Sequence, residues 1–171
     1  TADIASQISH FSYDHLVTLG MPETSAKYLN MLLLLGVVMV LVYVTAVLAR
    51  KIMLSATQQF SSKTSTQFDD FLVQHRTFRH LAKIIPLIIV VQSLPVIFSD
   101  FPSWIKPLRT LTDIYTVILT ITIVRALMRS LKDYLKTTEL FKDKPVDSFV
   151  QVITIFLYFI GGLLIFSLIV E

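Results

Sequence analysis

Apolar and polar residues occur along this chain in long blocks rather than in short alternating periods. Four apolar runs stand out, at residues 29–49, 81–98, 108–128 and 149–170. A helix needs about 20 apolar residues to cross a hydrocarbon core of about 30 Å. Three runs meet that length, and the second is shorter and contains Pro86 and Pro95, which predict a kinked helix. The pattern therefore predicts an all-α membrane protein with four transmembrane helices and helical extensions beyond the membrane.

The segment before the first run, residues 1–27, is polar and mildly acidic. Its apolar residues keep roughly helical spacing, at Ile4, Ile8, Phe11, Leu16 and Leu19. This spacing predicts a short amphipathic helix on the membrane surface. Gly20 and Pro22 are expected to end that helix, and residues 28–171 are expected to form the four-helix transmembrane bundle.

Polar segments connect the apolar runs. The first helix is predicted to continue beyond Arg50 and then to turn near residues 61–66. A new helix is expected from Thr66, capped by Thr66 or Ser65, with Asp69 and Asp70 in its first turn, and to run on into the second span. After the third span, residues 131–141 read as a basic helical extension that residues 142–145 break.

The basic residues are distributed unevenly between the connections. The segment between the first two runs and its flanks contain Arg50, Lys51, Lys63, Arg76, Arg79 and Lys83. The segment between the last two runs and its flanks contain Arg125, Arg129, Lys132, Lys136, Lys142 and Lys144, whereas the other side has only Lys27, Lys106 and Arg109. Cytoplasmic loops are enriched in Lys and Arg, so we expect both rich segments to be cytoplasmic and the N-terminus to be outside. The net charge of +3 thus reflects topology, and no basic patch interleaved with aromatic residues indicates a nucleic-acid partner.

Asp69 and Asp70 are candidates for acid–base chemistry, but adjacent residues on a helix point about 100° apart and do not converge on one atom. His75 is six positions from Asp69 and lies nearly on the opposite face. The pairs His10/His15 and His75/His80 share a five-residue spacing, which is typical of solvated surface positions. The chain has no cysteine and no recognisable catalytic, nucleotide-binding or haem-binding motif, so we expect neither an enzyme nor a bound metal or cofactor.

Several polar residues lie near the ends of the spans. Arg125, Arg129 and Lys132 lie at the inner end of the third apolar run or just beyond it. Arg125 and Arg129 are expected to snorkel to the interface, to bind lipid phosphates or to pair with another cytoplasmic element, and these readings are compatible with one another. Lys132 is a further candidate for a lipid headgroup. Asp113 is near the opposite edge of this run. Because no acid lies near the middle of a span, a proton-coupled transporter is disfavoured. The threonines at 112, 116 and 120 and the Gly161-Gly162 pair are interpreted as helix-packing residues.

Two stretches resemble the small-conductance mechanosensitive channel (MscS) family, most closely its five-span branch. The first is KTSTQFDDFLV at residues 63–73, which carries Lys63, Asp69 and Asp70 after the first span. The second is KPVDSFVQV at residues 144–152, which carries Pro145 at the entry to the fourth. The resemblance covers roughly residues 28–171.

This resemblance implies a membrane-tension sensor of a channel that releases ions or osmolytes on hypoosmotic shock. It implies a homoheptamer in a bacterial inner membrane, with membrane lipids as partners. The family's pore helix and cytoplasmic β domain would follow Glu171, so they are absent from this chain and no pore-lining residue can be assigned. Pro86 and Pro95 would allow tilting, and Arg125, Arg129 and Lys132 would hold lipid phosphates. The alternatives are a small helical scaffold subunit of a larger complex and a small transporter.

Overall fold

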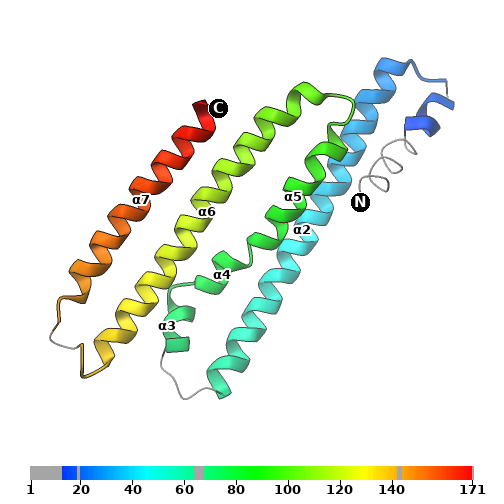
Figure 1. The fold of residues 1–171 in the computed structure, drawn as a ribbon. Coiled ribbons are helices and arrows are strands. Elements are labelled where there is room, and N and C mark those ends of the chain that lie inside the picture. The colour runs from blue at the N-terminus through cyan, green and yellow to red at the C-terminus, as the bar shows by residue number, and fades with distance from the viewer. Residues whose placement is uncertain (1–12, 19, 64–67, 142–143, 171) are drawn as a thin grey trace. The chain divides into compact units, whose positions relative to one another are not determined.

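A computed structural model describes residues 13–18, 20–63, 68–141 and 144–170, without the side chains of residues 56–63 and 69. Within these ranges every regular element is a helix (Figure 1). After a short helix at residues 13–18, the elements are α2 (Glu23–Lys63), α3 (Phe68–Gln74), α4 (Thr77–Leu81), α5 (Ile84–Ile97), α6 (Pro102–Thr137) and α7 (Val146–Val170). The all-α fold is therefore confirmed.

Four segments are long and apolar enough to cross a membrane, as the apolar runs predicted. They are Glu23–Ser55, Thr77–Ile97, Pro102–Thr137 and Val146–Val170. Helices suit these sequences because lipid offers no hydrogen bonds, and a helix satisfies its backbone groups internally. The helical extensions are also confirmed, since α2 continues to Lys63 and α6 to Thr137.

In the described part of the N-terminal segment, residues 13–18 are helical and α2 begins at Glu23. Gly20 has a φ of +85°, a left-handed conformation that glycine adopts without steric cost, and it separates the short helix from α2. The carbonyl of Pro22 accepts the first hydrogen bond of α2, from the N–H of Ala26 at 3.0 Å. Residues 1–12 and 19 lie outside the described residues, and with them His10 and most of the predicted amphipathic stripe.

The structure divides into two compact units, which we describe separately. The first unit comprises Thr1–Thr45 and Pro86–Thr112. On α2 its buried residues Ala26, Asn30 and Leu34 follow one another at intervals of four, which places them on one helix face. Tyr28 and Phe101 contact each other in this unit, with ring centroids 4.9 Å apart.

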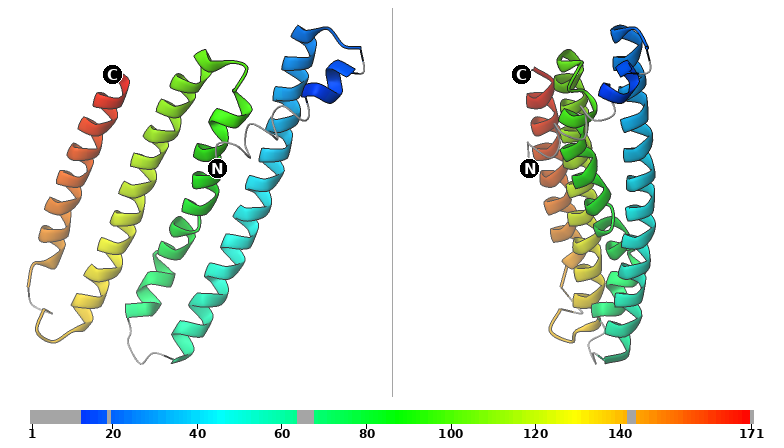
Figure 2. Two further views of the ribbon diagram at one scale, coloured as in Figure 1. Left: turned by 45° about the vertical axis from the view of Figure 1, so that its right-hand side comes forward. Right: turned by 90° about the vertical axis from the view of Figure 1, so that its right-hand side faces the viewer.

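The second unit comprises Ala46–Ile85 and Asp113–Glu171. In it α7 runs alongside α6 in both views of Figure 2. Most of its buried residues are small, namely Ala49, Thr77, Ala82, Ala126, Ser130 and Gly161. Small residues let helix backbones approach closely, which is how helices associate in a solvent as apolar as themselves.

The segment leading into the second span is not one helix, and the prediction of a single helix running on from Thr66 is wrong. α3 ends at Gln74, and Arg76 adopts a left-handed conformation with φ 55° and ψ 28° before α4 begins. A second turn at residues 82–83 separates α4 from α5. A non-glycine residue in this conformation costs about 1–2 kcal/mol, so contacts elsewhere must hold the turn in place.

The two prolines of the second span occupy different positions in α5. Pro86 is the third residue of the helix, where its missing N–H has no intrahelical partner to lose. Pro95 lies inside α5 and leaves the carbonyl of Val91 without an intrahelical donor. The helix breaks therefore lie before Pro86, at residues 75–76 and 82–83.

Only one member of the Gly161-Gly162 pair acts as a packing residue. Gly161 is buried, and a Cβ at this position would overlap the side chain of Ile121 on α6. Gly162 faces open space. The absence of a side chain at Gly161 thus sets how closely α7 approaches α6.

We expect Gly161→Leu to lower the free energy of unfolding by about 1–3 kcal/mol, because it overpacks the α6–α7 contact. Thermal unfolding in a single detergent would measure the change. Gly162→Leu is the matched control, since it makes the same gain in helix propensity without the overlap. Equal stability of the two variants would contradict this packing role.

Candidate functional site at the junction of α3, α4 and α6

A hydrogen bond joins the residue that follows α3 to α6 in the second unit. Nε2 of His75 lies 2.6 Å from Oδ2 of Asp133, although the two residues are 58 positions apart in the sequence. Their side chains are only 21% and 29% exposed. Partial burial reduces the competition from water, so this contact is stronger than a surface pair of the same geometry.

Ser130 forms the buried part of the same junction. Its Oγ lies 3.0 Å from the carbonyl oxygen of Ala126 and 3.1 Å from that of Phe71, so the hydroxyl proton is shared between α6 and α3. The hydroxyl of Thr77, the first residue of α4, lies 3.5 Å away, and both side chains are fully buried. Unpaired polar groups are costly to bury, so this arrangement fixes the positions of α3 and α4 on α6.

An aromatic contact completes the junction at the start of α3. The rings of Phe68 and Tyr134 meet edge to face, with centroids 5.4 Å apart and an interplanar angle of 73°. Such pairs contribute about 0.5–1.5 kcal/mol beyond the area they bury. Residues 68–77 are therefore attached to α6 at both ends, on either side of the left-handed Arg76.

The beginning of α7 is tied to the end of α6 by charge. Nζ of Lys132 lies 3.3 Å from Oδ1 of Asp147, and Lys136 pairs with the other oxygen of this carboxylate. The carbonyl of Pro145 accepts hydrogen bonds from the N–H groups of Ser148 and Phe149. Asp147 is 60% exposed, so water and salt screen both pairs and they stabilise the connection only weakly.

Arg125 and Arg129, predicted to bind lipid phosphates together with Lys132, have different surroundings. Nη1 of Arg125 donates a hydrogen bond of 2.6 Å to the hydroxyl of Tyr158, and the guanidinium lies 5.7 Å from the centroid of that ring. Arg129 is exposed and makes no ion pair with any described residue. Of the three, only Arg129 has no side-chain partner among the described residues.

The structure gives the backbone positions of the residues in the channel-like stretches but not all of their side chains. Lys63 is the last residue of α2 and Asp69 the second of α3, but both side chains lie outside the described residues. Asp70 is exposed in the first turn of α3, where the prediction placed it. Pro145 directly precedes α7.

The interpretation of His75 and His80 as solvated surface residues is wrong for His75 and incomplete for His80. His75 is held by Asp133, as described above. His80 is half-buried, and its Nδ1 is shielded from solvent without a hydrogen-bond partner among the described residues. Five-residue spacing addresses only whether two histidines share a helix face, and it carries no information about a partner from a distant helix.

The junction has the properties of a structural connection. No group of three His, Asp or Glu side chains within the described residues is arranged to hold a metal ion. Asp133, Ser130 and Tyr134 all point from one helix to the segment that precedes the second span. The arrangement fixes that segment on α6 and would release it if these contacts were broken.

Comparison with known proteins returned no family model, curated protein or solved structure that matches this chain.

We expect a coupling energy of about 1 kcal/mol between His75→Phe and Asp133→Ala in a double-mutant cycle, because each change removes the same hydrogen bond to the carboxylate. Unfolding of the purified chain in mixed micelles would give the four free energies. The control is a second cycle with Gln74→Leu and Glu139→Gln. Both residues are exposed and lie close in sequence to His75 and to Asp133, respectively, so they should show no coupling. A zero value for the His75–Asp133 cycle would mean that the contact does not hold α3 to α6.

Proposed function

We propose that residues 28–171 form the membrane-tension-sensing region of a mechanosensitive channel of the small-conductance family. The channel would release ions or osmolytes on hypoosmotic shock. The role is one of conformational response, without catalysis or a cofactor. It rests on the arrangement of the spans and on the resemblance carried by Lys63, Asp69, Asp70 and Pro145.

The observation that carries the proposal is the exposure of the apolar spans. In their most apolar windows, only 6% to 17% of the residues are buried within the structure. Large apolar side chains such as Tyr43, Phe159 and Phe166 are more than half exposed. Surface of this kind is compatible with lipid, and a protein whose conformations differ in lipid contact responds to a change in the bilayer.

The segmented entry to the second span supplies a means of movement. The turns at residues 75–76 and 82–83 lie on either side of α4, and short irregular connections of this kind absorb changes of helix direction. The His75–Asp133 pair and Ser130 hold one conformation of this region on α6. In the proposal, tension favours a second conformation in which these contacts are weakened.

The proposed channel assembles from several copies of one chain in a membrane. The channel is a homo-oligomer, with seven subunits as the resemblance implies, in the inner membrane of a bacterium. The N-terminus is outside and the basic ends of the spans are cytoplasmic, as the distribution of Lys and Arg favours. Membrane lipids contact the exposed faces.

The second candidate is a scaffold subunit of a larger membrane complex. The exposed apolar faces of α2 and α7 favour it as well, since another protein could cover them as lipid does. A transporter has less support, because the described helix breaks at residues 75–76 and 82–83 lie just before the second span and near its start, whereas transport sites lie near the bilayer midplane. Tension-dependent current separates a channel from both.

The decisive experiment is patch recording under suction of the full-length protein that contains these residues. We expect tension-gated currents. We expect Arg125→Gln with Arg129→Gln to raise the open-to-closed ratio at fixed tension about tenfold, because lipid phosphates held in the closed state would be lost.

Two controls separate the explanations of that result. Tyr158→Phe removes the hydrogen bond to Arg125 but keeps both charges, and it should change the threshold less. Lys27→Gln with Arg109→Gln removes the same charge at the other predicted membrane face and should leave the threshold unchanged. An unaltered threshold in the Arg125/Arg129 variant would remove these residues from gating, and the absence of any current would favour the scaffold.

The chain contains no cysteine, so single cysteines can report its orientation directly. We expect Ser99→Cys and Ser103→Cys to react with a membrane-impermeant maleimide on intact cells. Lys51→Cys and Glu139→Cys should react only after the membrane is opened. The reverse pattern would place the basic ends outside and contradict the proposed topology.

A further inference from the structure

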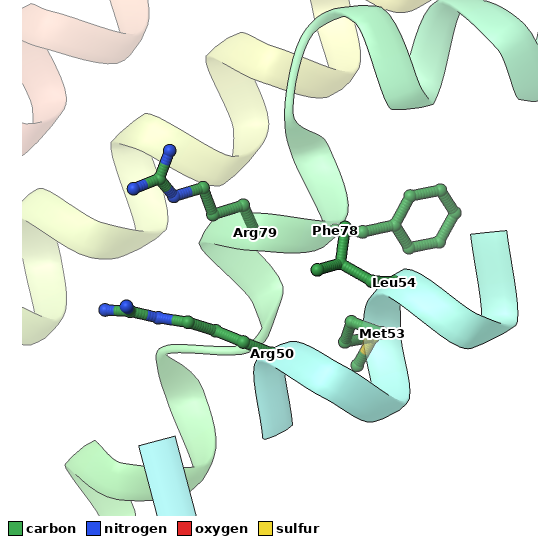
Figure 3. A pocket seen from close by; sticks show the side chains of 5 residues that line it. All are labelled: Arg50, Met53, Leu54, Phe78 and Arg79. Atoms are coloured by element: carbon green, nitrogen blue, oxygen red, sulfur yellow. The ribbon is translucent and has the colours of Figure 1, made fainter. Parts of the chain in front are cut away.

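A cavity of about 250 Å³ lies within the second unit, between the later part of α2 and α4 (Figure 3). It is lined by Arg50, Met53 and Leu54 from α2 and by Phe78 and Arg79 from α4. Figure 3 shows the side chains of Arg50 and Arg79 extending in the same direction from their two helices. The cavity therefore combines an apolar interior with two guanidinium groups on one side.

The charge of this cavity is not balanced by described residues. Neither Arg50 nor Arg79 makes an ion pair or a side-chain hydrogen bond with any residue whose side chain the structure describes. Residues 46–55 and 75–85 contain no acidic residue, and they add Lys51, Arg76 and Lys83 to the two arginines. Like charges gathered beside an apolar cavity repel one another, so an anion bound between them would be stabilised.

The position of the two arginines indicates which anion is suitable. Arg50 directly follows the apolar run of residues 29–49, and Arg79 comes two residues before the run of residues 81–98. Both are thus at the end of an apolar run, the level at which lipid headgroups lie. A phospholipid presents a phosphate at this level with acyl chains directly beneath it, which matches guanidiniums beside Met53 and Phe78.

We propose that this cavity binds one anionic phospholipid. Arg50 and Arg79 bind the phosphate through the paired N–H donors that guanidinium groups offer to phosphate oxygens. Met53, Leu54 and Phe78 contact the first part of an acyl chain. The site requires only that the second unit lies in a membrane, so it is independent of tension sensing and of the site at Arg125 and Arg129.

The test uses the purified full-length protein in a neutral detergent. Dioleoylphosphatidylglycerol is titrated into it, and native mass spectrometry measures how many lipids bind and how tightly. We expect one tightly bound lipid and weaker binding of dioleoylphosphatidylcholine. Arg50→Gln with Arg79→Gln should lower the affinity at least tenfold, since two charge-assisted hydrogen bonds are lost. Arg50→Lys with Arg79→Lys keeps the charge but not the paired N–H donors of the guanidinium, and should give an intermediate loss of affinity.

The matched control is Lys51→Gln with Arg76→Gln, which removes the same charge from adjacent exposed positions that do not line the cavity. It should change the affinity for the lipid less than twofold. If the Arg50/Arg79 and Lys51/Arg76 variants lose the same affinity, the lipid is held only by general electrostatic attraction and the proposed site is wrong. A second experiment adds inorganic phosphate as a competitor of the lipid. If it displaces the lipid at low millimolar concentration and Met53→Gln has no effect, the cavity binds a soluble anion and the lipid assignment is wrong.

Discussion

The contact on which the second unit depends is the attachment of residues 68–77 to α6. His75 and Thr77 are held by Asp133 and Ser130, and Arg76 between them adopts a conformation that is unfavourable for a residue with a side chain. Without the contacts on both sides, a continuous helix would be the more stable local structure, because it would avoid that strain and satisfy more backbone groups. The attachment therefore decides where α3 ends and at what point the second span begins.

The rest of the packing follows from an apolar environment. In lipid there is little gain from burying one apolar side chain against another, so helices associate where small residues allow close approach. Gly161 against Ile121 and Ala126 beside Ser130 are examples in the second unit. Large apolar side chains remain on the outside of the helices, where the proposed function assigns them to lipid.

Charged residues in the second unit fall into two groups with different surroundings. Lys132, Lys136 and Asp133 are engaged with partners on neighbouring segments and stabilise the arrangement of the helices. Arg50, Arg79 and Arg129 have no described acidic partner, although each is close to the end of an apolar run. The first group maintains the structure, and the proposals above assign the second group to anions.

The sequence by itself determined the number and helical nature of the spans, because a run of about 20 apolar residues has few other stable structures in a bilayer. It also placed Asp70 in the first turn of a helix and Pro145 before the last one. It did not reveal the pairing of His75 with Asp133, the left-handed turn at Arg76 or the cavity beside Arg50 and Arg79. No glycine or proline marks that turn, and both the pairing and the cavity join residues far apart in the sequence. Only the tertiary structure decided them, since local propensity favours a continuous helix there and contacts with α6 overcome it.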